Sequence, residues 1–153
     1  MLQHVAFGGY LLAAAWAMAR LEVQIEGRNG WARNLPTWRV DNRLTRTLFG
    51  GRPLTGYHFF FHILVALLVH SPFALGFAPL TVSAELRILS FLILFWLIED
   101  WLWFVVNPAF GPAAFRADRI HWHRSSWWLI MPREYWIAAP IGVGLYILSH
   151  TLA

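Results

Sequence analysis

One stretch of the chain, residues 88–106, is apolar for long enough to cross a lipid bilayer, yet it carries two adjacent acids, Glu99 and Asp100. About 20 helical residues span the ~30 Å hydrocarbon core of a membrane. A charged side chain at that depth costs at least ~2.5–3.5 kcal/mol and is rarely left without a partner. The stretch therefore predicts a membrane helix whose acids meet partners from other parts of the chain.

The composition favours the same class of protein. Of the 153 residues, 58% are hydrophobic and only 13% are charged, whereas soluble domains are typically about 45–50% apolar and about 25% charged. The chain has no cysteine, which excludes disulfides and thiolate metal sites. Any metal ion must then be held by histidine, carboxylate or carbonyl oxygen.

Four segments are long and apolar enough to be transmembrane helices: residues 5–26, 57–77, 85–106 and 135–152. Every backbone amide must bond internally inside a bilayer, so helices are the expected form. We therefore predict an all-α, polytopic membrane protein that forms a single domain, a small bundle of four transmembrane helices. Pro72 is expected to kink the second helix or to end its straight part.

The arginines predict the orientation of this bundle. All twelve basic residues are arginine, and ten of them lie in the segments after the first and third helices. Because cytoplasmic loops carry the excess of basic residues, both segments are placed inside and both termini outside. The expected location is the inner (cytoplasmic) membrane of a bacterium. Arginines confined to such loops give no reason to expect nucleic acid as a partner.

These two cytoplasmic loops, residues 27–56 and 115–136, are also rich in tryptophan. Tryptophan and arginine are both favourable at the level of the lipid head groups, which predicts two amphipathic loops lying on the membrane surface. An alternative for some of these tryptophans is that they cover a pocket.

Polar residues from four segments converge on the cytoplasmic side. At 1.5 Å per residue, Glu99 and Asp100 lie roughly 10 Å from the inner end of their helix. Side chains four apart share a helix face, and an extended His-x-His motif places both rings on one side. The predicted cluster consists of Glu22, Glu26, His58, His62, Glu99, Asp100, His121 and His123.

Imidazole and carboxylate together suit zinc, iron or manganese. The predicted metal ligands are Glu22, Glu26, His58, His62, Asp100, His121 and His123, and the predicted catalytic residues are Glu99 and Asp100. Eight candidate ligands exceed the needs of one ion, so two ions are favoured, as in di-iron carboxylate proteins. The alternative is a network of acids, histidines and arginines that holds no metal.

The site type is analogous to that of membrane hydroxylases and desaturases, although the chain has one His-x-x-x-His motif and no His-x-x-His-His box. We therefore predict a membrane-embedded, metal-dependent enzyme that acts on a lipid or other hydrophobic substrate at the cytoplasmic leaflet. Di-iron oxidative chemistry, with an electron donor, is favoured over zinc-dependent hydrolysis of a lipid amide or ester. Two further functions are consistent with the same residues: a metal or proton transporter, assembled as a homo-oligomer, and an accessory subunit without catalytic activity.

Overall fold

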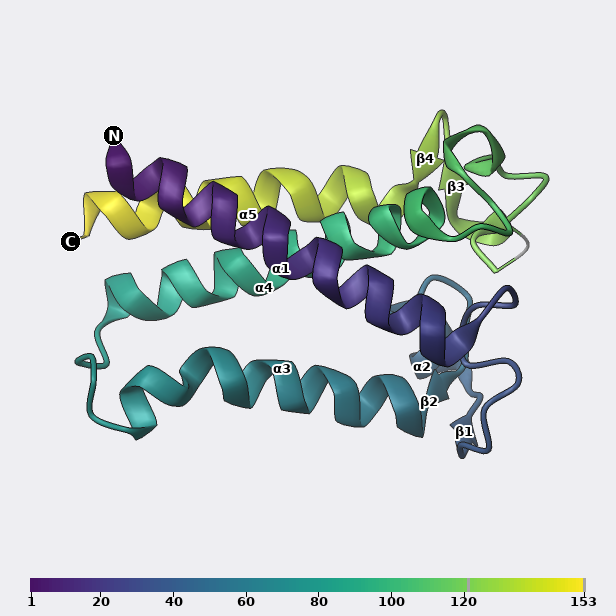
Figure 1. Ribbon diagram of the computed structural model, residues 1–153, viewed down its shortest axis with the longest axis horizontal. Coiled ribbons are helices and arrows are strands. Elements are labelled where there is room, and N and C mark those ends of the chain that lie inside the picture. The colour runs from purple at the N-terminus through teal and green to yellow at the C-terminus, as the bar shows by residue number, and fades with distance from the viewer. Residues whose placement is uncertain (121, 153) are drawn as a thin grey trace.

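The computed structural model describes residues 1–120 and 122–152, and these residues are mostly helical, as predicted. The long helices are α1 (Leu2–Glu26), α3 (Gly56–Ala74), α4 (Val82–Val106) and α5 (Arg133–Thr151). Each begins and ends within three residues of the bounds predicted from sequence. Two arginine-rich connections, residues 27–55 and 107–132, join α1 to α3 and α4 to α5. Figure 1 shows both termini and the α3–α4 turn at one end of the molecule, and the two arginine-rich connections at the other end.

The arginine-rich connections contain short elements that the sequence did not predict. The first holds β1 (Arg39–Val40), α2 (Arg43–Leu48) and β2 (Leu54–Thr55), and β1 pairs with β2 in antiparallel fashion. The second holds η1 (Pro112–Ala114), η2 (Arg124–Ser126) and the antiparallel pair β3 (Trp127–Trp128) and β4 (Met131–Pro132). Strands of two residues are too short to show the alternation of side chains by which a strand is detected.

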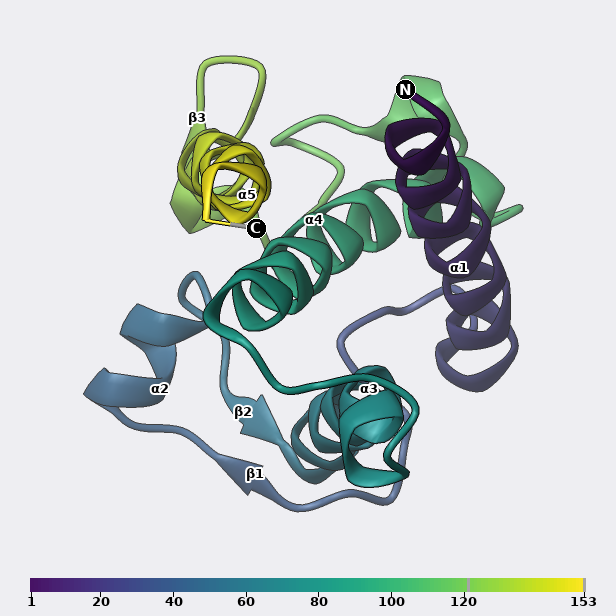
Figure 2. The ribbon, with the colours of Figure 1, turned by 90° about the vertical axis from the view of Figure 1, so that its left-hand side faces the viewer.

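Helix α4 is the central element of the fold. It packs along both α1 and α5, whereas it touches α3 at few places. Figure 2 shows α4 between its neighbours, with α3 standing apart below it. The inner core on the α1 side is formed by Leu11, Ala15, Val65, Phe91 and Phe95.

Small residues bring α4 and α5 into close contact. Ser90 donates its hydroxyl hydrogen to the carbonyl oxygen of Gly142 over 2.7 Å, and Ser83 donates to Ser149 over 2.6 Å. A Cβ atom at Gly142 would lie only 2.6 Å from Leu94 Cγ. Glycine is therefore required for the present separation of the two helices.

The ends of α1 and α4 meet near the arginine-rich connections. Asn107, which follows the last residue of α4, donates from Nδ2 to the carbonyl oxygen of Gly27 over 2.9 Å, and Gly27 follows the last residue of α1. The carboxylates on the last turns of both helices are thereby brought to the same level. Pro72 lies inside α3, which ends two residues later at Ala74.

Two helices in the described residues, α3 and α4, are long and apolar enough to cross a membrane. The sequence predicted four such helices. α1 and α5 have the required length, but they are less apolar than α3 and α4.

Candidate functional site

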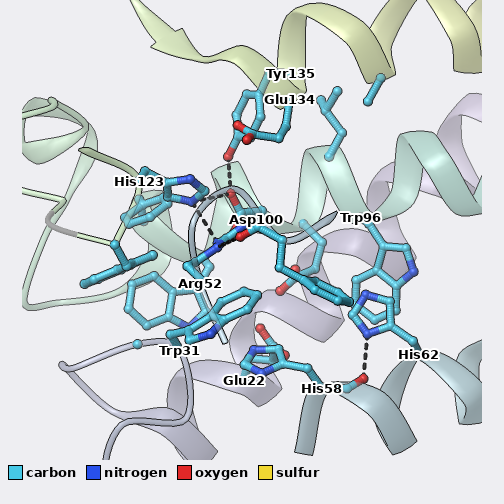
Figure 3. Close-up of a pocket in the computed structure, with 18 of the residues that line it drawn as sticks. Glu22, Trp31, Arg52, His58, His62, Trp96, Asp100, His123, Glu134 and Tyr135 are labelled. Atoms are coloured by element: carbon cyan, nitrogen blue, oxygen red, sulfur yellow. Dashed lines mark hydrogen bonds and ion pairs between the residues drawn. The ribbon is translucent and has the colours of Figure 1, made fainter. Parts of the chain in front are cut away.

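A cavity of about 360 Å³ lies where α1, α3, α4, α5 and the arginine-rich connections meet. Figure 3 shows its polar side chains pointing toward a common space from different elements. Seven of the eight residues in the predicted cluster line this cavity; they are Glu22, Glu26, His58, His62, Glu99, Asp100 and His123. The eighth, His121, lies outside the described residues.

The first pair in the cavity joins α1 to α3. His58 Nε2 lies 3.5 Å from Glu26 Oε1, and both side chains are buried. Thr55 precedes α3 and caps it by accepting a hydrogen bond from the backbone N–H of His58. The same hydroxyl lies 2.7 Å from His58 Nδ1. The helix cap therefore fixes the imidazole so that its Nε2 faces Glu26.

The second pair joins α4 to the second connection. His123 Nε2 lies 3.2 Å from Asp100 Oδ2, and the phenol of Tyr135 donates to the same carboxylate oxygen. Arg52 approaches His123 Nε2 from the other side, with a distance of 3.3 Å from its Nη1. These contacts are visible at the centre of Figure 3.

His123 Nε2 can serve only one of these neighbours at a time. Arginine only donates, so a bond from Arg52 requires Nε2 without a proton. A carboxylate only accepts, so a bond to Asp100 requires Nε2 with a proton. Asp100 and Arg52 therefore compete for the same nitrogen atom of His123, and the position of one proton decides which of them it binds.

The tautomer of neutral His62 follows from its environment. Its Nδ1 lies 2.6 Å from the carbonyl oxygen of His58, which can only accept, so Nδ1 carries the proton. Nε2 of the neutral ring is then left with a lone pair, the form in which histidine binds metals. The ring stacks on Trp96 with the centroids 4.1 Å apart.

The backbone after α1 is held in an unusual conformation at the edge of the cavity. Trp31 and Ala32 have φ values of 46° and 51°, in the left-handed region that residues other than glycine rarely adopt. The N–H of Ala32 donates to Glu26 Oε1 over 2.5 Å, and the indole N–H of Trp31 donates to the carbonyl oxygen of Pro53 over 2.8 Å. Both bonds hold Trp31 against His58, with ring centroids 4.1 Å apart.

Arg52 is the positively charged side chain at the wall of the cavity. Its guanidinium carbon lies 3.8 Å from the centroid of the Trp31 ring. Burial lowers the pKa of this guanidinium, although the nearby carboxyls of Asp100 and Glu134 act in the opposite direction. Arginine remains charged in proteins, so Arg52 contributes one positive charge to the site.

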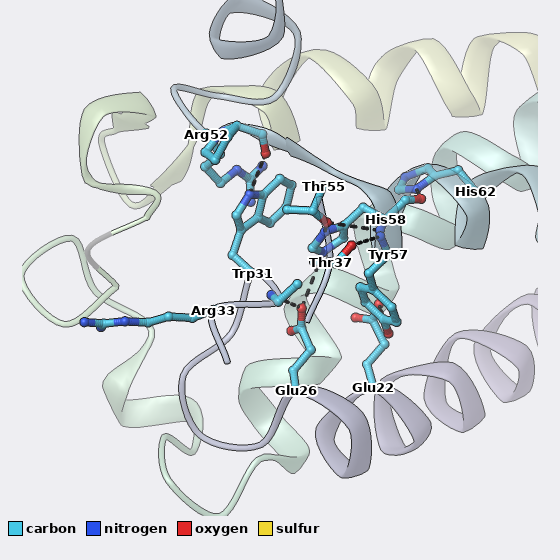
Figure 4. Close-up of polar contacts among 12 residues, drawn as sticks. Glu22, Glu26, Trp31, Arg33, Thr37, Arg52, Thr55, Tyr57, His58 and His62 are labelled. Carbon is cyan, nitrogen blue, oxygen red and sulfur yellow. Dashed lines mark hydrogen bonds and ion pairs between the residues drawn. The ribbon is translucent and has the colours of Figure 1, made fainter. Parts of the chain in front are cut away.

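Two further acids complete the lining on the α1–α4 side. The phenol of Tyr57 donates to Glu22 Oε1 over 3.0 Å (Figure 4). Glu99 is only 3% exposed, and no hydrogen-bond partner is found for its Oε1 among the described residues. A buried carboxylate oxygen without a partner is costly, so this atom is available to a ligand in the cavity.

The described lining contains more acids than permanent cations. It holds five carboxyl groups and a single guanidinium, that of Arg52, together with three imidazoles. Buried carboxylates in excess must take up protons or bind a cation. Within the described part of the chain, no three donor side chains are close enough to form a metal cluster in the present geometry. The donors are instead arranged as the pairs Glu26–His58 and Asp100–His123.

Several residues of this site are not evident from the sequence. In the sequence, Arg52 is recognised only as a topology signal, and nothing assigns Tyr57 or Tyr135 to the cluster. Trp31 is one of the loop tryptophans for which covering a pocket was the alternative, and it lines the cavity. The contacts of these residues join positions 22 to 71 residues apart in the chain, so no local pattern reveals them. His70 and Ser90 do not line this cavity, and each has a partner elsewhere: Glu85 Oε1 lies 3.2 Å from His70 Nε2, and Ser90 donates to α5.

Comparison of the chain with protein-family models, curated proteins and solved structures found no match.

Proposed function

We propose that this protein is a membrane-embedded, metal-dependent enzyme that acts on a hydrophobic substrate at the cytoplasmic leaflet. The observation that carries the proposal is the excess of carboxyl groups in one cavity, including the unpartnered Oε1 of Glu99. A divalent cation would balance that charge, and imidazole nitrogen with carboxylate oxygen is a donor set for iron, manganese or zinc.

The membrane assignment is supported by how little of the apolar surface is covered. In the most apolar windows of α3 and α4, only 11% and 33% of the residues are buried within the protein. The central helix of a soluble protein is mostly buried. Lipid would cover the remaining apolar side chains, with α1 and α5 as the third and fourth spans. The arginine-rich connections would lie in the cytoplasm.

The types of donor in the cavity, rather than their present separations, suit a bound cation. His58 and His62 would bind it through Nε2, with their Nδ1 atoms oriented by Thr55 and by the His58 carbonyl oxygen. Carboxylates from α1 and α4 would hold it from the opposite side. An iron pair would supply oxidative chemistry when bound, and His123 would move protons between Asp100 and the substrate.

The lining also suits a hydrophobic substrate. Most of the remaining wall is aromatic or aliphatic: Trp31, Phe49, Trp96, Trp103, Phe104 and Trp122. Apolar walls with a few convergent polar groups are typical of small-molecule sites. An acyl or isoprenoid chain would enter from the membrane between these rings.

Hydrolysis is the second candidate, and a specific contact favours it. The Asp100 carboxylate is held by Tyr135 beside His123, which is an arrangement able to take a proton from water. With a single zinc ion in the cavity, this pair would activate water for attack on a lipid ester or amide.

Metal content distinguishes these proposals. We expect purified, chelator-washed protein reloaded with Fe(II), Mn(II) or Zn(II) to retain bound ions, measured by elemental analysis. Glu99→Gln and His58→Ala should lose them, whereas Glu85→Gln should retain them, because Glu85 is paired with His70 away from the cavity. Two ions of iron or manganese per chain support oxidative chemistry, and one zinc supports hydrolysis. A folded wild type that retains no metal would contradict the proposal.

A further inference from the structure

A second cavity, of about 320 Å³, adjoins the first on the side of the arginine-rich connections. Trp31 and Arg52 line both cavities and so form part of the wall between them. The two cavities differ in the ionisable side chains that line them. The second is lined by Arg33, Arg39 and Arg52, and no carboxylate is found among the described residues that line it.

Two of these guanidinium groups are fixed in place by the fold. Arg39 donates to the carbonyl oxygens of Ala32 and Thr37 over 2.5 and 3.0 Å. Arg52 lies against Trp31 and donates from Nε to the carbonyl oxygen of Phe49 over 2.7 Å. Each group therefore keeps N–H donors for another partner. In Figure 4, Arg33 extends away from Glu26 and the histidines.

Two other arginines of the same connections have acidic partners: Arg46 lies 2.6 Å from Asp41, and Arg116 lies 3.2 Å from Asp118. None of the three arginines of the second cavity forms such an ion pair in the described part of the chain. Like charges gathered around one space repel each other, and an anion placed between them relieves the repulsion.

We propose that the second cavity binds the phosphate group of an amphiphilic substrate, a phosphate ester of a hydrophobic alcohol, whose chain lies in the first cavity. A phosphate offers enough oxygen atoms to accept hydrogen bonds from several guanidinium groups, whereas a carboxylate is satisfied by one. Asn29 and Ser125 add neutral donors to the wall. This inference rests on the proposed function for the reacting half of the substrate.

The test is calorimetric titration of metal-free protein in detergent with three probes. Dihexanoyl phosphatidic acid carries chain and phosphate, dihexanoylglycerol carries the chain alone, and inorganic phosphate carries the phosphate alone. We expect the phosphatidic acid to bind best. The glycerol analogue should bind at least roughly tenfold more weakly, because it cannot form the charge-assisted hydrogen bonds. Binding of inorganic phosphate without binding of phosphatidic acid, or equal binding of the two lipids, would overturn the proposal.

Two arginine variants test whether the phosphate group binds in the second cavity. Arg33→Gln removes a charge whose side chain makes no hydrogen bond in the described structure, so the fold should be kept, and phosphatidic acid should bind roughly tenfold more weakly. The control is Arg43→Gln, an exposed arginine of α2 outside both cavities, which should change binding by less than about twofold. Equal losses in both variants would show a diffuse charge effect and would overturn the proposal.

Because the titration uses metal-free protein, its outcome is independent of the metal measurement. If the protein retains no metal but binds phosphatidic acid through its arginines, the phosphate site is supported and the metal-dependent enzyme is rejected. If the protein retains metal but does not bind phosphatidic acid, the metal-dependent enzyme is supported and this substrate class is rejected.

Discussion

Helix α4 makes two very different contacts with its neighbours. On its face toward α5, Ser83 and Ser90 donate hydrogen bonds to carbonyl oxygens of α5, and the two helices approach closely at Gly142. Its face toward α3 is held mainly by aromatic rings, as where Trp96 stacks on His62, and part of it lines the cavity. The first contact favours close packing of two helices, and the second leaves space beside the cavity.

Gly142→Leu should have the largest effect on stability. The new side chain would collide with Leu94, and forced overpacking typically costs about 1–3 kcal/mol. Thermal unfolding in detergent measures this loss. The matched control is Gly144→Leu, at a position with nothing within 4 Å of an added Cβ. If both variants unfold at the same temperature, the α4–α5 contact is not packed as closely at Gly142 as the structure indicates.

Ser90→Ala should come next. It removes a buried hydrogen bond between two helices, which contributes about 0.5–1.5 kcal/mol net. Ser71→Ala is the control, because the Ser71 hydroxyl donates to Leu68 within its own helix. We expect a lower unfolding temperature only for the Ser90 variant. Equal shifts would mean that the hydroxyl does not join α4 to α5.

His62→Phe should have the smallest effect on stability, below about 0.5 kcal/mol, because the aromatic stack on Trp96 is preserved and the α3 backbone keeps its own bonds. The same variant should retain less metal, since it removes one of the proposed metal ligands. His70→Phe is the control: His70 also binds the carbonyl oxygen four residues earlier, but it does not line the cavity. A His62 variant as unstable as Gly142→Leu would show that α3 is as tightly packed as α5.

The sequence determined the helices and one side of the site. Long apolar runs bounded by Gly, Pro and polar residues define α1, α3, α4 and α5 because hydrophobicity and helix ends are local properties. The loop arginines placed both connections at one end, as Figure 1 shows. The acids and histidines were identified by type and depth, and those within the described residues line one cavity.

Only the tertiary structure decided which partners meet. Asp100 pairs with His123 and Tyr135, whereas Glu99 turns its buried carboxylate toward the cavity, although the two acids are adjacent in sequence. Arg52, which the sequence marked only as a topology signal, lies in the wall between a cavity rich in carboxyl groups and a cavity lined by arginines. These facts depend on the rotation of α4 and on loop conformations held by contacts between distant residues, such as Glu26 with Ala32 and Trp31 with Pro53. Periodicity in a sequence places a residue on an element, but packing between elements decides what that residue faces.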